Sequence, residues 1–408
     1  MDLERTGERI RRERERAGFT ERQLADRAGL SQSTLHRIEH GTRAAVTLAE
    51  IDRIAEALEI PLRLITSGNP VRERVQIAAR INTLVEADRE EALRQSLQIL
   101  ELDARLDRAG PAPDEQRQQR RPAGVPLPQA SRSPELQGKD LAAAVRLTLD
   151  LGTAPIADID ELIEQLTGVD TAVVQLPKTV DGFTLTDPVR RTTLVAVRAC
   201  EVPERQRFTF GHELGHLLLE DGTAEHQIGD ERSPAEERCN AFARHLLAPE
   251  DGILSWLGTR PNPVIDAEKH PCGERVVALM ARHFRVSLAV VLIQIEHMGL
   301  ISASLKKSLK GPSGAELAQR YGWGPAYEQE QSAANTVRPP RRILERAILA
   351  YRENRIGIRA LAGLEGRSIH ETEAALKEAG ITVTPPATRR ADLGRLLAHG
   401  SAGRQSGQ

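Results

Sequence analysis

Apolar residues recur three and four positions apart through the first part of the chain, with polar residues between them. This spacing predicts short amphipathic helices, because it places the apolar side chains on one face. Gly29 and Gly41 interrupt the pattern, and Pro61 ends its last segment. We therefore expect a small domain of five helices over residues 1–68. The apolar positions are Ile10, Leu24, Ala25, Ala28, Leu35, Ile38, Leu48, Ile51, Ile54, Ala55 and Leu58.

A second helical stretch, residues 69–108, is highly charged and carries a single apolar stripe. Such a stripe either packs on its own domain or pairs with the same helix of a second chain, which would give a homodimer. Residues 109–138 lose the pattern and are rich in Pro, Gln and Arg, which predicts a flexible linker. The stripe consists of Ile77, Ile81, Leu84, Val85, Leu93, Leu97 and Leu100.

The segment that follows, residues 139–305, mixes helical and strand patterns. Two short helical segments precede three β-rich runs, at 171–176, 183–186 and 192–197, and long helical segments resume at about residue 204. This order predicts an α+β domain with a small antiparallel sheet. The whole chain is therefore expected to be multidomain and mostly α-helical.

The C-terminal region, residues 306–390, again has a helical pattern, and residues 391–408 are expected to be a disordered tail. Ile358 to Leu364 and Ser368 to Gly380 resemble a second helix-turn-helix pair. A helical bundle packed against the preceding domain is the simpler interpretation of the same pattern.

Length, charge and cysteine content limit the class of protein. A chain of 408 residues is too long for one ordinary core, which predicts two to three domains. The net charge of −2 gives no overall attraction for nucleic acid, so DNA binding must come from a local surface. Three cysteines without a C-x-x-C pair favour a reducing compartment. The charged N-terminus and the lack of an apolar run of about 18 residues favour a cytoplasmic protein without a membrane partner.

Two of the predicted N-terminal helices have the form of a helix-turn-helix unit. Glu21 to Ala28 would be the first helix, Gly29 the turn and Ser31 to Glu39 the second helix, with Ser31 as its N-cap. The exposed face of the second helix would carry hydrogen-bonding side chains that can reach base edges in a major groove. These side chains are Gln32, Ser33, His36 and Arg37.

The string Leu24-Ala25-x-x-Ala28-Gly29-Leu30-Ser31, followed by Leu35-x-x-Ile38-Glu39-x-Gly41, resembles the phage-repressor-like XRE family over about residues 7–65. The resemblance implies DNA as a partner, with base contacts from Gln32, Ser33 and Arg37 and phosphate contacts near Thr42 and Arg43. One departure is Glu21, where the family often has a Gln that touches the DNA backbone. A carboxylate there would repel phosphate, and residues 1–68 hold twelve basic and twelve acidic residues, so weak or dimer-dependent DNA binding is expected.

The strongest chemical signal in the chain is His212-Glu213-x-x-His216. On a helix the two imidazoles lie about 40° apart on one face, so both can bind one zinc ion, while Glu213 reaches the attacking water. The other sides of this helix are apolar, and burying two His and a Glu there is costly without a partner such as a metal.

A third protein ligand is needed, and a downstream Glu on a second helix is a common solution. Helix spacing places Glu236 and Asn240 on one face, so Glu236 could bind the zinc while Asn240 orients a ligating His. Glu237 is the fallback ligand. His226 lies in a polar connection and His245 faces the opposite side of the helix, so both are weaker candidates. His and carboxylate ligands would also suit Mn²⁺ or Fe²⁺.

These residues belong to a longer string that resembles the ImmA/IrrE-type metallopeptidases over about residues 140–305. The string runs from Arg205 to Leu218 and continues as Glu236-x-x-Cys239-Asn240-Ala241-Phe242-Ala243, with Cys239 where the family usually has Ala. The resemblance implies a zincin-like fold, with His212, His216 and Glu236 as zinc ligands and Glu213 as the catalytic base. It also implies a substrate, because members cleave repressors of the XRE class and often carry an XRE domain themselves.

Two functions remain open at this point. One is a DNA-binding regulator with an active zinc peptidase domain that cleaves an XRE-type repressor or a similar protein. The other is a non-proteolytic transcription regulator whose metal domain is sensory or structural. A complete set of ligands and base favours the first, since a sensor has no need of Glu213.

Overall fold

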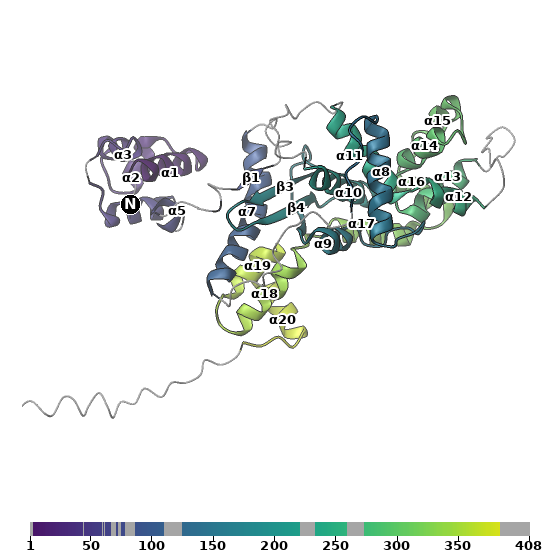
Figure 1. Ribbon diagram of the computed structural model, residues 1–408. Helices are drawn as coiled ribbons and strands as arrows, with labels where there is room; N and C mark the ends of the chain where they lie inside the picture. Colours follow the sequence, from purple (N-terminus) through teal and green to yellow (C-terminus); the bar gives the residue numbers. More distant parts are fainter. Residues whose placement is uncertain are drawn as a thin grey trace, which may run out of the picture.

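The computed structural model describes residues 3–43, 45–58, 60, 62–66, 71, 75–77, 86–109, 125–220, 233–258 and 273–383. The N-terminal part is the expected bundle of five helices, and it has its own hydrophobic core (Figure 1). The helices are α1 (Leu3–Arg16), α2 (Glu21–Arg27), α3 (Gln32–Glu39), α4 (Leu48–Ala57) and α5 (Leu62–Thr66).

Local sequence signals determine how α2 and α3 begin and how they are joined. The hydroxyl of Thr20 accepts from the Gln23 amide at the start of α2, and that of Ser31 accepts from the Thr34 amide at the start of α3. Gly29 lies between the helices with a φ of +63°, a conformation that disfavours side chains with a Cβ. The Gly29 turn and the Ser31 cap are those that the sequence predicts for a helix-turn-helix unit, whereas the Thr20 cap was not predicted.

The middle of the chain forms a sheet in the order β1-β3-β4-β2. Its strands are β1 (Gln76–Ile77), β2 (Asp170–Val174), β3 (Gly182–Asp187) and β4 (Thr192–Arg198). The last three match the three β-rich runs of the sequence.

The sheet is mixed, whereas the sequence pattern predicted an antiparallel one. β3 pairs antiparallel with β4 and with β1, but β2 and β4 are parallel. β4 lies between β3 and β2. It runs opposite to β3, its hairpin partner, and in the same direction as β2. Alternation within each strand does not encode this choice of neighbour.

One face of the sheet is covered by α9 (Ile159–Thr167) and α10 (Pro203–Leu219), which share a core with Val173, Val195 and Val197. Beyond α10 lie α11 (Pro234–Leu247) and then α8 (Pro134–Thr148), which packs closely on α11 (Figure 1). This face carries the candidate metal centre.

The other face of the sheet is covered by α7 (Glu86–Ala109), α18 (Arg341–Arg352) and α19 (Ile358–Glu365). Leu100 and Leu106 of α7 are buried in this second core, together with Phe183 and Leu185 of β3, and Leu93 packs against it. The stripe that a homodimer would use is therefore covered, as far as the described residues show, by this chain's own sheet and C-terminal helices. Ile81, Leu84 and Val85 of the stripe lie outside the described residues.

A buried carboxylate strengthens the second face. The Asp103 side chain on α7 has no exposed surface and pairs with Arg190 at 2.7 Å and Arg342 at 3.2 Å, and also with Arg346. Arg190 follows β3 and the other two lie on α18, so the network joins three segments that are far apart in sequence. Charges buried to this extent require such partners.

The remaining helices continue from α11 to the C-terminal part. They are α12 (Glu250–Leu257), α13 (Gly273–Phe284), α14 (Leu288–His297), α15 (Ala303–Leu309), α16 (Gly314–Tyr321), α17 (Gly324–Ala334) and α20 (Ile369–Glu378). Among the described residues no single helix is long and apolar enough to cross a membrane; α13 and α14 reach that length only together, and the chain bends by 107° between them. The tail expected at 391–408 lies outside the described residues.

Candidate metal centre

The candidate metal centre lies between α10 and α11, which pack unusually closely. A Cβ at Gly215 would stand 3.1 Å from the Phe242 ring and 3.2 Å from Cys239 Sγ, and one at Gly211 would stand 3.4 Å from Ala243 Cβ. Two glycines one turn apart thus let α10 and α11 approach each other. Gly211 and Gly215 lie on either side of His212 in the sequence of α10. The close approach brings side chains of both helices together.

His212, His216 and Glu236 meet at this contact. The two Nε2 atoms are 3.0 Å apart, and the Glu236 oxygens lie 3.3 Å from His212 Nε2 and 3.2 Å from His216 Nε2. Glu236 occupies the first turn of α11, which Ser233 caps by accepting from the Glu236 amide. The N-cap therefore determines where on α11 this carboxylate stands.

Asn240 lies one turn after Glu236 and contacts the other nitrogen of His212. His212 Nδ1 is 2.9 Å from Asn240 Oδ1. An amide oxygen can only accept, so Nδ1 carries the proton and Nε2 presents a lone pair toward His216 and Glu236. The position of Asn240 agrees with the orienting role that its helical spacing predicts.

Glu213 is 2% exposed and is held by a strand residue. Its Oε2 accepts a hydrogen bond of 2.9 Å from Thr184 Oγ1 on β3. Sequence reasoning missed Thr184, which stands 29 residues before Glu213 and carries no motif of its own. The side chain of Thr184 points to the α10 face because its neighbours Phe183 and Leu185 point into the opposite core.

The donor set fits a divalent transition metal. Two neutral imidazole nitrogens and a carboxylate are typical ligands of catalytic zinc, with the fourth position left to water. Bonds of about 2.0–2.1 Å at tetrahedral angles would separate ligand atoms by roughly 3.3–3.4 Å, close to the separations of 3.0–3.3 Å between these three residues. His212, His216 and Glu236 also form one of two His/Glu groups, among the described residues, whose ligand atoms lie within 4.8 Å of one another.

The weaker ligand candidates lie elsewhere or outside the described residues. Glu237 is exposed and does not belong to the group. His245 is buried, and its Nε2 lies 2.9 Å from Glu135 of α8, on the other side of α11. Burial alone would raise the pKa of Glu135, but hydrogen bonds from His245 and Arg244 bring it to about 2. His226 is outside the described residues.

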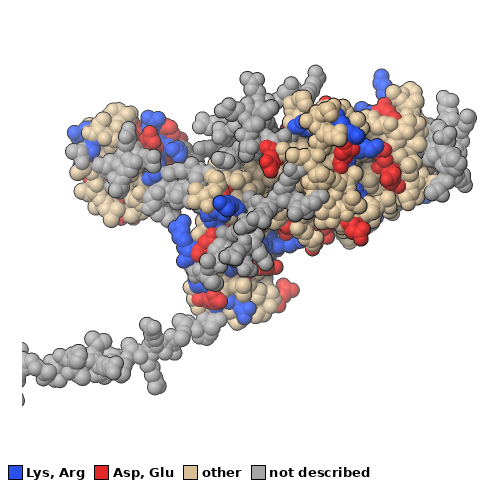
Figure 2. Space-filling view, viewed as in Figure 1, with Lys and Arg blue, Asp and Glu red and all other residues tan. Residues whose placement is uncertain are grey.

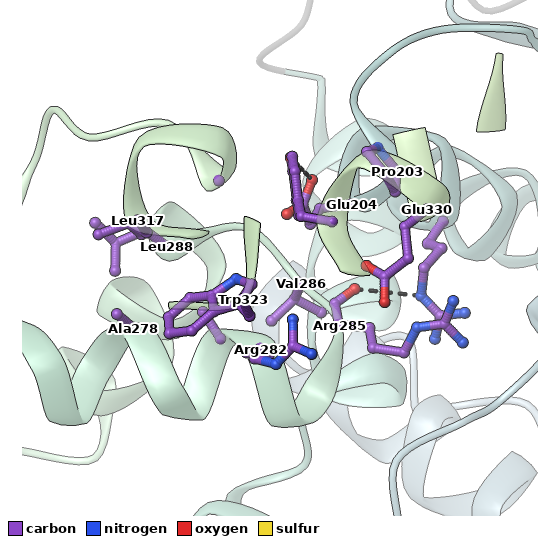
Figure 3. Close-up of a pocket in the computed structure, with 14 residues that line it drawn as sticks. Pro203, Glu204, Ala278, Arg282, Arg285, Val286, Leu288, Leu317, Trp323 and Glu330 are labelled. Atoms are coloured by element: carbon purple, nitrogen blue, oxygen red, sulfur yellow. Dashed lines mark hydrogen bonds between the residues drawn. The ribbon is translucent and has the colours of Figure 1, made fainter. Parts of the chain in front are cut away.

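A small cavity lies apart from this centre. It lies between the start of α10, α13 and α17, has a volume of about 30 Å³, and is lined by Glu204, Arg282, Trp323 and Glu330 among others (Figure 3). This is room for about one water molecule. The Tyr327 hydroxyl there donates to Glu204 at 3.0 Å, and burial raises the pKa of Glu204.

The proposed DNA-contacting residues occupy one region of the N-terminal bundle. Gln32, Ser33 and Arg37 are exposed on α3, and Thr42 is exposed after it. Arg43 is half-buried and donates to Glu50 at 2.8 Å, so part of its charge is already paired. Acidic and basic residues are interspersed on the visible face of this bundle (Figure 2).

Glu21, the residue that departs from the family pattern, has a partner in the same unit. His36 Nδ1 lies 3.1 Å from Glu21 Oε1, and this hydrogen bond lowers the pKa of Glu21 below its usual value. The carboxylate is therefore charged near neutral pH, at the edge of the face where DNA contacts are expected.

Comparison with known proteins agrees with this division of the chain. Residues 10–65 match the helix-turn-helix family, and residues 169–296 match the family described as the IrrE N-terminal-like domain. The radiation response metalloprotease IrrE of Deinococcus radiodurans is 34% identical over 140 residues, a match that covers 33% of this chain and 40% of the relative's length. No solved structure matches the chain. The chain thus carries an N-terminal helix-turn-helix domain followed by an IrrE N-terminal-like domain that is related to a metalloprotease.

Proposed function

We propose that the protein is a DNA-binding regulator whose second domain is a zinc-dependent endopeptidase. The observation that carries the proposal is the meeting of His212, His216 and Glu236 in a buried contact between two helices, next to a buried Glu213. A purely structural zinc site is usually closed by four protein ligands and needs no further carboxylate beside them, whereas three ligands with an open position are typical of catalytic zinc. The hydrogen bond from Thr184 holds the Glu213 carboxylate in a defined position beside the three ligands.

Each residue of the centre has a proposed role. His212, His216 and Glu236 hold the ion, and Asn240 keeps His212 in the tautomer that presents Nε2. The ion would supply Lewis-acid polarisation of the scissile carbonyl. Glu213 takes a proton from the attacking water and delivers it to the leaving amine. Thr184 holds Glu213 in place through its Oε2.

The substrate of this domain is proposed from the arrangement of the chain. A protein of the XRE class, bearing a helix-turn-helix unit like the one over residues 10–65, would be recognised near DNA or through contacts between similar domains. Gln32, Ser33 and Arg37 would contact bases, and Thr42 and Arg43 phosphates. Such binding would place the peptidase domain close to repressors at the same operator.

The test is a cleavage assay with purified XRE-class repressors. The full chain, loaded with zinc, is incubated with each repressor, and products are followed by gel and mass spectrometry. We expect cleavage by the wild type and none after chelation or in Glu213→Gln. If the zinc-loaded wild type cleaves no XRE-class repressor, the proposed substrate is wrong. If Glu213→Gln cleaves as fast as the wild type, the proposed mechanism is wrong.

A further inference from the structure

A second group of side chains that could bind a metal lies in the helix-turn-helix domain. In the sequence it is far from the centre between α10 and α11. It consists of Glu21, the first residue of α2, of His36 on α3, and of His40, the C-cap residue of α3. One ligand atom of each lies within 4.8 Å of the other two. The two imidazoles are one helical turn apart, and their ring centres are separated by 4.1 Å.

Hydrogen bonds prepare these side chains to accept a metal. His40 Nδ1 lies 2.8 Å from the His36 carbonyl, which can only accept, so His40 carries its proton there and presents the Nε2 lone pair outward. A backbone carbonyl that fixes the tautomer of a histidine in this way is common behind metal ligands. His36 Nδ1 in turn lies 3.1 Å from a Glu21 oxygen, so this imidazole and the carboxylate are already in contact.

The two helices that carry the group are held firmly relative to each other. Leu24 of α2 and Leu35 and Ile38 of α3 are fully or almost fully buried in one core. Arg14 also acts electrostatically on Glu21, but its guanidinium is engaged by Glu39 at 2.7 Å. Cross-helix ligation would therefore require only side-chain rotation, which lowers the entropic cost of binding.

The group is open to solvent, unlike the centre between α10 and α11. His36 and His40 are exposed, and the Glu21 side chain is about a quarter exposed. Exposure provides a route for an ion and room for water to complete its coordination. In a buried site the loss of water strengthens the attraction between the ion and its ligands. The exposed group lacks this contribution, so we expect it to bind an ion more weakly and to exchange it.

We propose that Glu21, His36 and His40 form a second site for a divalent transition cation such as Zn²⁺, and that its occupancy strengthens DNA binding. The second half of the proposal rests on the DNA-binding function proposed above. His36 lies on the exposed side of α3 near Ser33 and Arg37, so an ion held there stands among the residues assigned to DNA. The bare carboxylate of Glu21 repels phosphate, whereas the occupied group is net positive and attracts it.

The first experiment measures metal binding alone. The full chain is stripped with a chelator and titrated with zinc by calorimetry, as the wild type, His40→Ala and the control His370→Ala, which removes an exposed histidine of α20. We expect a tight and a weaker class of sites in the wild type and the control, and loss of the weaker class in His40→Ala. An unchanged weaker class in a His40→Ala protein with normal helical content would overturn the proposed site.

The second experiment measures the coupling to DNA. Binding of a labelled random-sequence duplex at low salt is followed by fluorescence anisotropy with and without zinc. We expect zinc to raise the affinity of the wild type and of His370→Ala by about fivefold to tenfold, and to have no such effect on His40→Ala. Zinc bound at the weaker site without any change in DNA affinity would overturn the coupling. If no variant binds DNA at all, the proposed DNA function fails, while the titration still decides on the metal site.

Discussion

Two regions of this molecule present the same chemical arrangement under opposite conditions. On α10 and on α3, two histidines stand one turn apart, and a neighbouring helix supplies a glutamate. Between α10 and α11 the group is buried, with His212 at 3% and Glu236 at 9% exposure. On α3 the two histidines are exposed.

The comparison shows what burial adds to a set of ligands. Buried imidazoles and a carboxylate lose water, so each must be matched by a metal, a hydrogen bond or a charge. The buried group accordingly has Asn240 behind His212 and Thr184 behind Glu213. In the exposed group, His40 contacts one backbone carbonyl and His36 contacts Glu21 itself. We expect a catalytic, tightly held ion in the first place and an exchangeable ion in the second.

The largest effect should come from Glu213→Gln. This substitution should convert the buried centre from a catalytic site into one that only binds the ion. The amide cannot take a proton from water, so peptide cleavage should fall by about 10²–10⁴-fold while zinc content is kept. Cleavage rate and metal content measure the two parts. Glu237→Gln, an exposed change on α11, should leave both unchanged.

The next effect concerns the ligands. His216→Ala should weaken zinc binding at the buried centre by more than about 100-fold, since losing even a residue that only supports a ligand costs about 10–100-fold. It should also abolish the rise in melting temperature that zinc gives the wild type. Calorimetry and thermal unfolding measure these changes. An undiminished affinity at the tight site would remove His216 from the ligand set.

The close packing of α10 on α11 can be tested with Gly215→Ala. The added Cβ meets the Phe242 ring at 3.1 Å and Cys239 Sγ at 3.2 Å, so the helices must separate. The free energy of unfolding should fall by about 1–3 kcal/mol. The control is Gly363→Ala on α19, where nothing lies within 4 Å; that change should raise it by up to about 1 kcal/mol. Equal effects in denaturant unfolding would contradict the packing argument.

Thr184→Val tests whether the strand positions the base. The isosteric change removes the hydrogen bond to Glu213, so kcat for cleavage should fall by about tenfold, with KM and metal binding unchanged. Thr186→Val on the same strand is the control, since that hydroxyl pairs with Thr193 instead. Equal kcat values for the two variants would argue against a positioning role.

The smallest effect is expected at the exposed group. In the absence of zinc, Glu21→Gln should raise the affinity for a random-sequence duplex about twofold to threefold, because it removes one negative charge facing phosphate. The gain should shrink as salt is added. Asp52→Asn on α4, an exposed acidic position of the same bundle, is the comparison for a change of net charge alone. Equal gains for both variants would show that the position of Glu21 is unimportant.

Local patterns were sufficient for much of the candidate site. The spacing of His212 and His216 follows from one turn of helix, and the spacing of Glu236 and Asn240 from one turn of the next. Helix spacing favoured Glu236 over Glu237 as the third ligand but could not decide between them. The rotation of α11 depends on how it packs against α10 at Gly211 and Gly215. Thr184 could not be found, because the contact with Glu213 arises only when β3 lies against α10.

The fold divides in the same way. The sequence alone predicted the helices of the N-terminal bundle, the Ser31 cap and glycine turn of the helix-turn-helix unit and the three long strands, because these depend on neighbours within a few residues. Tertiary structure decided that β2 and β4 run parallel, and that α7 is covered by α18 and α19 rather than left open for a second chain. Such choices depend on contacts between segments that are distant in sequence. The periodicity of apolar residues predicts that a face is buried, but it does not indicate which segment will cover it.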